Sequence, residues 1–362
     1  MLETLLQKLL EFTFGDRLFR VALLMLYGLS TLAGLLLITA VLLRVLRDHQ
    51  QRQRQKREQR WRSLLLAVLT EAQPPQALWA QVSPKEAMDF CAFLYRFARL
   101  VTGSELEQLH ALAAPYLPRL ERQVFRGTPE ERAFRLQILG VLGRRTQTEL
   151  LVQALDDPAP LVVLVAFRQL AHPETAHLAP ILIDQMPRLY QTSPALLGAL
   201  LARLGFEALP ALRQALLDEH RPVWVRVVLA DALHRLNDPK GAHLAADLLQ
   251  HPDLPAELVQ ALLRLIAAAG TPAHQGVILP YLQHPDEAVR VEAVRALGVV
   301  GSEAQLPRLA AALQDPSPWV AMAAARALKQ RQALTLLQEA ARQPALRPLI
   351  EQVLHEDPAR IL

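Results

Sequence analysis

The stretch HPDEAVRVEAVRALGVVGSEAQLPRLAAALQ, from His284 to Gln314, contains two helical patterns separated by a glycine-containing turn. Apolar residues recur at helical spacing and predict one apolar stripe on each helix: Val289, Ala293, Ala296 and Leu297, then Leu306, Leu309, Ala310 and Leu313. Pro285, Asp286 and Glu287 predict the first turn of the first helix, because proline fits that position and acidic residues favour it. Gly298 and Gly301 predict the turn. Two such helices cannot bury both stripes alone, so the units must stack.

The same pattern recurs along the chain. HPDLPAELVQALLRLIAAAGTPAHQGVILPYLQ begins at His251, RPVWVRVVLADALHRLNDPKGAHLAADLLQ at Arg221 and DPSPWVAMAAARAL at Asp315. Prolines at nearly regular intervals open successive units: Pro129, Pro158, Pro194, Pro222, Pro252, Pro285 and Pro316. A period of about 30 residues predicts a helical solenoid. The composition, 52% hydrophobic but only 5% aromatic, favours an all-α core of aliphatic side chains.

The unit from His284 to Gly301 matches the pattern D/H-P-x-x-x-V-R-x-x-A-x-x-A-L-G-x-x-G and resembles HEAT repeats, in the short form found in bacterial HEAT-like proteins. The resemblance covers about Pro129 to Ala341 and is strongest from Arg221 to Leu328. It implies a right-handed HEAT-like α-solenoid that binds other proteins. It also implies that Arg226 and Arg290 are structural, pairing with aspartates between successive units.

Before the repeats lies VALLMLYGLSTLAGLLLITAVLL, 23 uncharged residues from Val21 to Leu43. As a helix they would extend roughly 35 Å, enough to cross a bilayer core of ~30 Å. Residues 16–46 are therefore predicted to form a single transmembrane helix. A buried core helix and a cleaved signal peptide are the alternatives, but the dense basic run that follows favours an uncleaved anchor.

That basic run, RDHQQRQRQKREQRWR at 47–62, is either a nucleic-acid-binding arm or the flank of a membrane anchor. The chain has 39 Lys and Arg and 35 Asp and Glu. Residues 1–62 hold 11 of the basic and 5 of the acidic residues, which leaves 28 basic and 30 acidic residues for the rest of the chain, so the array itself is nearly neutral. This balance favours a juxtamembrane segment that attracts anionic lipid and disfavours nucleic acid. The predicted membrane-surface residues are Arg44, Arg47, Arg52, Arg54, Lys56, Arg57, Arg60 and Arg62. Because basic flanks stay in the cytoplasm, we expect an outside N-terminus and a cytoplasmic array at a bacterial inner membrane.

The sequence also predicts the structure of the remaining segments. Residues 1–15 predict an amphipathic helix on the outer membrane surface, ended by Gly15-Asp16, with a frayed tail as the alternative. Residues 63–127 predict a helical N-terminal cap, in which Phe90, Phe93 and Phe97 gather in the core or around a pocket. Residues 128–343 form the repeats, and 344–362 a closing helix and tail. Trp61 is expected to begin the packing of the folded part.

The chain lacks the common catalytic and phosphate-binding motifs. A multi-thiolate zinc site is excluded because Cys91 is the only cysteine, and we expect it to be a buried apolar residue. His172 and His177 in HPETAH are expected in a turn, not on a metal, and His251 and His284 are expected to be turn or cap residues. We therefore expect no catalytic residue, no cofactor, no metal and no small-molecule substrate.

The sequence thus predicts a non-enzymatic scaffold or regulatory subunit, anchored in a membrane, that binds a membrane protein or membrane-associated complex. A bacterial envelope assembly, such as a membrane glycosyltransferase system, is the expected setting. The candidate partner-binding residues lie on the second helices of the units: Arg213, Gln214, Gln275, Arg308 and Gln338. The alternatives are a HEAT-like enzyme of lyase or DNA glycosylase type, or an extracytoplasmic HEAT-like binding protein.

Overall fold

The computed structural model describes residues 2–143 and 148–356, and all regular structure within these ranges is helical. In the first helix, side chains are described at 3–4, 25–39, 41–42, 44 and from 55 onward. The chain divides into two compact units, Met1–Leu112 and Ala113–Leu362. Each unit is described below by itself.

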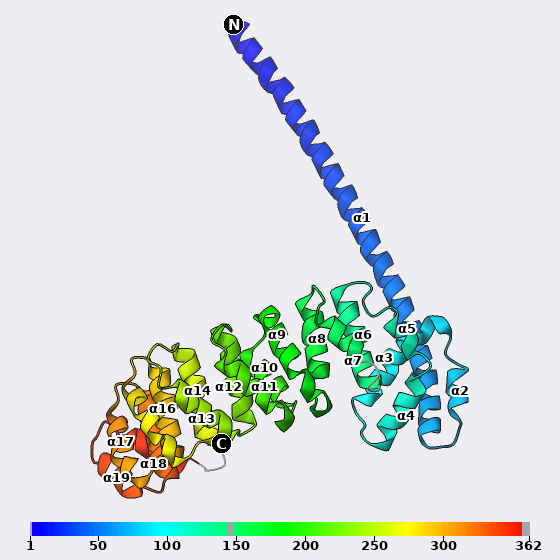
Figure 1. Ribbon diagram of the computed structural model, residues 1–362. Coiled ribbons are helices and arrows are strands. Elements are labelled where there is room, and N and C mark those ends of the chain that lie inside the picture. The colour runs from blue at the N-terminus through cyan, green and yellow to red at the C-terminus, as the bar shows by residue number, and fades with distance from the viewer. Residues whose placement is uncertain (1, 144–147, 357–362) are drawn as a thin grey trace. The chain divides into compact units, whose positions relative to one another are not determined.

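The first unit begins with one long helix, α1 (Leu2–Leu69), whose 68 residues correspond to roughly 100 Å. It is followed by α2 (Pro75–Trp79), the 3-10 turn η1 (Pro84–Glu86), α3 (Ala87–Ala98) and α4 (Ser104–Ala113), which reaches the unit boundary. Figure 1 shows α1 as an unbroken ribbon.

The predicted helix break at Gly15-Asp16 was wrong, because α1 continues through both residues. A glycine inside a helix costs only about 1 kcal/mol relative to alanine. Extending an existing helix is easier than starting a new one, so helical residues on both sides can outweigh that cost. The backbone of α1 also continues as a helix from the apolar segment into the basic segment.

Among the residues with described side chains, no single helix meets the length and apolarity needed to span a membrane. The apolar part described in α1 is Met25–Thr39, and residues 16–24, 40, 43, 45 and 46 of the predicted transmembrane helix lie outside the described side chains. One bent pair, Pro194–Ala202 with Phe206–Leu217, meets the criteria jointly across a 105° bend.

The second unit is a two-layer array of helices. The first helices of its units are α6 (Pro129–Leu142), α8 (Pro160–Leu170), α10 (Pro194–Ala202), α12 (Val223–Arg235), α14 (Ala256–Ala269), α16 (Glu287–Val300), α18 (Pro318–Gln330) and α20 (Arg347–His355). The second helices are α7 (Thr148–Ala154), α9 (Ala179–Gln185), α11 (Leu209–Leu217), α13 (Pro239–Leu248), α15 (Gln275–Ile278), α17 (Leu306–Ala311) and α19 (Leu334–Ala340). Short 3-10 turns extend several second helices, such as η8 (Glu303–Gln305) before α17 and η9 (Ala312–Gln314) after it.

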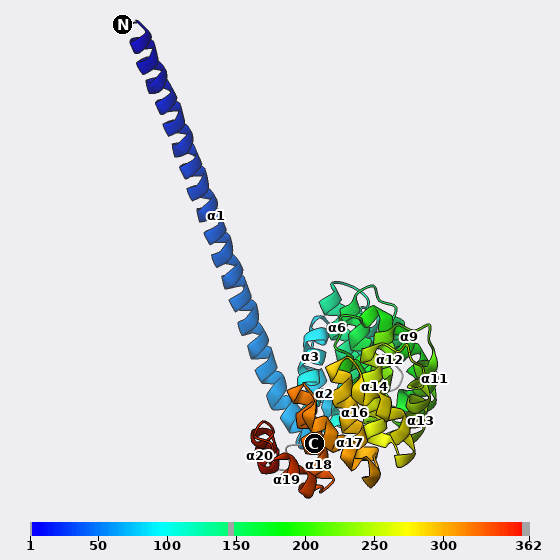
Figure 2. The same cartoon turned by 90° about the vertical axis from the view of Figure 1, so that its left-hand side faces the viewer.

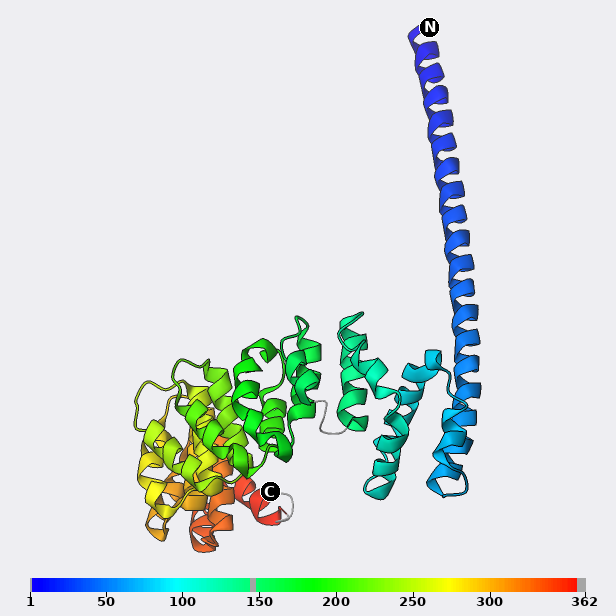
Figure 3. The ribbon, with the colours of Figure 1, turned by 45° about the vertical axis from the view of Figure 1, so that its right-hand side comes forward.

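Successive first helices pack against one another, from α10 through α12, α14 and α16 to α18 and α20, and α6 packs on α8. Figures 2 and 3 show this succession of neighbouring helices. Within one repeat, Val289, Ala293 and Leu297 are almost fully buried, as are Leu309 and Leu313 of the second helix. The α-solenoid predicted from the repeat period is therefore confirmed, while its right-handed twist stays a prediction.

Gly298 has a different role from the predicted one. It lies inside α16 and is buried, and a Cβ placed there would come 2.6 Å from the Cβ of Ala327 in α18. The glycine therefore permits the close approach of two first helices and does not form the turn. Gly301 does end α16, since its NH donates to the carbonyl of Leu297.

Among the unit-opening prolines, Pro285 acts differently from the prediction. Pro129 and Pro194 occupy the first position of a helix, but Pro285 precedes α16, which is capped by Asp286. The Asp286 carboxylate accepts hydrogen bonds from the NH groups of Ala288, at 2.8 Å, and Val289. The aspartate begins this helix, because its carboxylate accepts hydrogen bonds from free NH groups of the first turn, and a proline side chain has no acceptor atom.

The boundary between the units falls earlier than the predicted start of the array at residue 128. The short helix α5 (Leu117–Glu121) packs on α6, which places residues 113–127 with the array. At the other end of the array, α20 packs on α18.

Candidate interaction site

The C-terminal part of α1 is held on α3 by ion pairs. Arg57 Nη1 lies 3.1 Å from Glu86 and 3.6 Å from Asp89, and Arg96 lies 2.7 Å from Glu58. Burial alone would raise the pKa of Glu86, but hydrogen bonds from Ser83 and Arg57 lower it below its usual value. Pairs this exposed contribute about 0–1 kcal/mol each. These pairs therefore link α1 to η1 and α3 but add little to the stability of the unit.

An aromatic cluster lies beneath these ion pairs. Trp61 is only 1% exposed, and its ring centroid lies 5.4 Å from that of Phe90 and 5.8 Å from that of Phe93. Phe93 lies 4.9 Å from Phe97. Edge-on and tilted pairs at these distances are favourable beyond the area they bury. The expectation that Trp61 begins the packing of the folded part is therefore confirmed.

Cys91 lies in the same helix as the aromatic residues and is fully buried, as predicted. Burial raises the pKa of its thiol to about 12. The thiolate is the reactive form of cysteine, so this thiol is inert in the folded protein.

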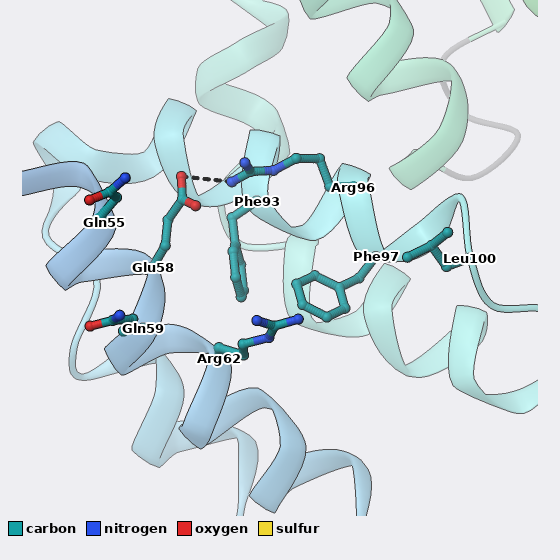
Figure 4. Close-up of a pocket in the computed structure, with 8 residues that line it drawn as sticks. All are labelled: Gln55, Glu58, Gln59, Arg62, Phe93, Arg96, Phe97 and Leu100. Atoms are coloured by element: carbon teal, nitrogen blue, oxygen red, sulfur yellow. Dashed lines mark ion pairs between the residues drawn. The ribbon is translucent and has the colours of Figure 1, made fainter. Parts of the chain in front are cut away.

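A groove of about 570 Å³ opens between α1 and α3 beside the aromatic cluster. It is lined by Gln55, Glu58, Gln59 and Arg62 of α1 and by Phe93, Arg96, Phe97 and Leu100 in and just after α3. Figure 4 shows Phe93 and Phe97 between the polar side chains, with Arg62 next to Phe97. The Arg62 guanidinium lies 5.9 Å from the Phe97 ring centre, within cation–π range. Leu100 is 82% exposed. The groove therefore has an apolar floor and a rim of amides and charged groups.

The predicted membrane-surface residues fall into three groups in the structure. Arg44, Lys56, Arg60 and Arg62 are exposed, whereas Arg57 is half-buried in its ion pairs. The side chains of Arg47, Arg52 and Arg54 lie outside the described residues. Arg57 thus acts within the fold.

Three ion pairs in the array join an arginine to an aspartate of the next unit at one common sequence spacing: Arg132–Asp157, Arg213–Asp238 and Arg290–Asp315. In each pair the guanidinium donates to both carboxylate oxygens of the aspartate. The same aspartate also accepts a backbone NH at the start of a helix, which is the next one along the array in the layer that contains the arginine. Burial would raise the pKa of Asp157 and of Asp315, but hydrogen bonds from the arginine and from the backbone hold both values below the usual range. The structural role expected for Arg290 is confirmed.

Arg226 does not form the expected pair. It is buried, and its Nε donates to the carbonyl of Leu216 at 2.9 Å, while its Nη2 has no hydrogen-bond partner among the described residues. In the part of the chain that the structure describes, Asp253, which lies in the turn before the following helix α14, is exposed and forms no ion pair with Arg226.

The candidate partner-binding residues are distributed over four second helices. Gln214, Arg308 and Gln338 are exposed on α11, α17 and α19. Gln275, at the start of α15, accepts hydrogen bonds from the NH and the hydroxyl of Ser302, each at 3.0 Å. Arg213 is engaged with Asp238. Partner binding by these residues stays a prediction, and Gln275 and Arg213 already have structural contacts.

Two histidines, His243 and His274, form a hydrogen-bonded pair. His274 is 6% exposed, and its Nε2 is hydrogen-bonded to Nδ1 of His243, while its Nδ1 accepts the NH of Thr271 at 3.0 Å. Burial lowers the pKa of His274, and nearby His243 lowers it further. His172 and His284 each accept a backbone NH two residues ahead, as expected of turn residues. Within the described part of the chain, no group of three His, Cys, Asp or Glu side chains is placed to hold a metal ion.

Comparison with known proteins identifies the repeat. Residues 253–329 match the family model for HEAT repeats, so this part of the chain carries HEAT repeats. No curated protein sequence matches the chain.

Eleven chains of solved structures are similar to this chain, and they include the following two. Human deoxyhypusine hydroxylase in complex with glycerol is 20% identical, over 77% of this chain and 98% of that one, with a TM-score of 0.31. The complex of CpcE and CpcF of phycocyanin lyase from Nostoc sp. PCC7120 is 18% identical, over 66% and 94%, also with a TM-score of 0.31. Likeness at this level carries no argument about what this chain does.

Proposed function

We propose that this chain is a non-enzymatic scaffold or regulatory subunit that α1 anchors in a membrane. One observation carries the proposal: large apolar side chains of α1 are exposed on every side of the helix. Eleven of them are 55–71% exposed: Met25, Leu26, Tyr27, Leu29, Leu32, Leu35, Leu36, Leu37, Ile38, Val41 and Leu42. Consecutive positions such as Leu35 to Ile38 point in all directions around a helix, so no single protein surface could cover them.

Transfer of these apolar side chains from water into lipid would be strongly favourable. Burying eleven such side chains to this extent is worth on the order of 10–20 kcal/mol. The two threonine hydroxyls of the segment are satisfied locally: the Thr31 hydroxyl donates to the carbonyls of Tyr27 and Gly28, and the Thr39 hydroxyl to that of Leu35, at 2.7–3.0 Å. A helix that pairs its hydroxyl groups internally can enter hydrocarbon without leaving donors unmet.

The orientation rests on the basic residues that follow the apolar segment. Arg44 is exposed one residue after Leu43, where attraction to anionic headgroups is strongest. Lys56, Arg60 and Arg62 lie roughly 20–28 Å farther along the helix than Leu43, beyond a Debye length of about 8–10 Å. We therefore assign lipid contact to the start of the basic segment. The N-terminus would be outside and the array in the cytoplasm of a bacterial cell.

The array would present its HEAT-like surface to a protein of the same membrane, for example a component of an envelope assembly such as a membrane glycosyltransferase system. Support comes from the regular helical array itself, since stacked repeats offer long binding surfaces. Ion pairs between the repeats occupy several of the arginines in building the array, including Arg132 and Arg290.

Alkaline carbonate extraction of membranes that contain the full chain tests the anchor. We expect the wild-type chain to stay in the membrane pellet, and a Leu32→Arg/Leu36→Arg variant to be released. A charged residue at the centre of a span costs about 2.5–3.5 kcal/mol on insertion scales. The matched control, Trp319→Arg/Leu334→Arg, changes two exposed apolar residues of the array and should stay in the pellet. Release of the wild-type chain by carbonate would refute the anchor.

A further inference from the structure

The groove between α1 and α3 combines features that point to a protein ligand. Its floor is aromatic, and the floor continues outward to Leu100, which is 82% exposed although it is a large apolar side chain. Gln55 and Gln59 supply amide donors and acceptors from α1. Apolar floors with a few polar groups at the rim are typical of binding sites.

The rim carries unbalanced positive charge. Glu58 is already paired with Arg96, whose side chain is still 56% exposed. Among the described residues, Arg62 has no carboxylate within ion-pair distance and instead contacts the Phe97 ring. Exposed cations around an apolar floor favour an acidic ligand with an apolar anchor.

The distance along α1 separates the groove from a lipid surface. From Leu43, the last residue of the apolar segment, Gln55 and Arg62 are roughly 18 and 28 Å away along a continuous helix. A tilt of 40° would still leave them about 14–21 Å from that point, whereas the headgroup layer adds only about 5–8 Å on each side of the core. Lipid chains do not extend that far.

We propose that this groove binds an acidic peptide segment, with one or two large apolar side chains, from a protein of the same membrane. The apolar side chains enter beside Phe97 and Leu100, and the acidic groups meet Arg62 and the exposed part of Arg96. A second copy of this chain is disfavoured, because parallel copies would bring together basic segments that each carry seven Lys and Arg against two acidic residues at 47–62. The choice of a membrane partner rests on the proposed anchor, but the binding chemistry of the groove does not.

The test uses the full chain, purified in neutral detergent, and three fluorescein-labelled synthetic peptides. The first is an amphipathic 14-residue helix with Leu and Phe on one face and Glu on the other. The second replaces every Glu with Lys, and the third replaces every Leu and Phe with Ser. Binding is followed by fluorescence anisotropy against the wild-type chain and against Leu100→Ser and Arg62→Gln. Both changed residues are exposed, so these variants should fold, which circular dichroism can verify.

We expect the first peptide to bind at least ten-fold more tightly than the other two. Leu100→Ser should weaken it about ten-fold and Arg62→Gln about three-fold, and salt should weaken the remaining affinity. Matched controls, Leu334→Ser and Arg342→Gln, change exposed residues of the other unit and should bind like the wild type. Equal binding of the Lys peptide, or equal losses in the control variants, would overturn the proposal. So would displacement of the peptide by phosphatidylglycerol vesicles, which would indicate a lipid site.

The two proposals fail separately. If the chain stays in the membrane under carbonate but does not bind the acidic peptide, the groove proposal is refuted and the anchor stands. If the peptide binds but carbonate releases the chain, the groove stands and the anchor is refuted.

Discussion

The close approach of α16 and α18 at Gly298 predicts a large effect from one methyl group. In Gly298→Ala the new Cβ would lie 2.6 Å from the Cβ of Ala327, and neither atom belongs to a flexible side chain. Two methyl groups normally sit at about 3.8 Å, so the helices must separate by about 1 Å. Overpacking of this kind costs about 1–3 kcal/mol, against which the better helix propensity of alanine returns about 1 kcal/mol. We expect a net loss of about 0–2 kcal/mol.

Thermal unfolding of the full chain, followed by circular dichroism, measures this loss. A loss of up to about 2 kcal/mol should lower the midpoint by up to roughly 8 °C for a unit of this size. Gly276→Ala is the control, since a Cβ there has nothing within 4 Å and should stabilise by about 0.4–1 kcal/mol. Gly298→Ala combined with Ala327→Gly removes the clash and should recover most of the loss. If Gly298→Ala stabilises the chain as much as Gly276→Ala does, the packing argument is wrong.

Three further predictions concern single groups. Arg290→Gln leaves the mostly buried Asp315 carboxylate without its partner and should cost about 1–3 kcal/mol at pH 7. The lowered pKa of Asp315 means that the stabilisation is present above its usual value of 3.8 and is lost as pH falls, so urea unfolding at pH 7 and pH 3.5 should show a shrinking difference from wild type. A constant difference would contradict the ion-pair explanation. The lowered pKa of His274 has the same sign: neutral His274 is favoured in the fold, so stability should fall as pH drops below about 6.5, and His274→Gln should reduce that slope between pH 7.5 and 5.5. The same slope in both proteins would contradict this role. Cys91 should not react with a maleimide at pH 8 until the chain is unfolded by denaturant, since it is buried and its pKa is raised to about 12; labelling of the native chain at the unfolded rate would contradict this.

The repeat period made the fold predictable. Regular proline spacing and apolar stripes such as Val289 to Leu297 identify stacked helix pairs, because only stacking can bury those stripes. The link from Arg290 to an aspartate of the next unit was also predictable, from the resemblance to HEAT repeats. The matching pairs of Arg132 and Arg213 were not recognised, although the same spacing from arginine to aspartate was present in the sequence.

Other features depend on distances that sequence patterns do not contain. Gly298 reads as a turn residue beside Gly301, but its role comes from the position of Ala327 in the first helix of the next unit. Asp286 and Pro285 are adjacent, and only the helix start shows which of them begins α16. The aromatic side of the groove was predicted as the pocket alternative for Phe93 and Phe97, but its α1 side was not, because Gln59 and Arg62 are distant from α3 in the sequence. An apolar residue directly after a helix end, as Leu100 is, was the available signal.

The most direct test of the membrane-anchored arrangement is the accessibility of single introduced cysteines from the two sides of the membrane. Cys91 is the only natural cysteine and is buried, so it provides a silent background. Glu3→Cys and Gln338→Cys place reactive thiols at exposed positions near the N-terminus and in the array. With a membrane-impermeant maleimide, we predict labelling of Glu3→Cys alone in spheroplasts and of Gln338→Cys alone in inverted membrane vesicles. Labelling of both positions from the same side would contradict a single membrane crossing between them.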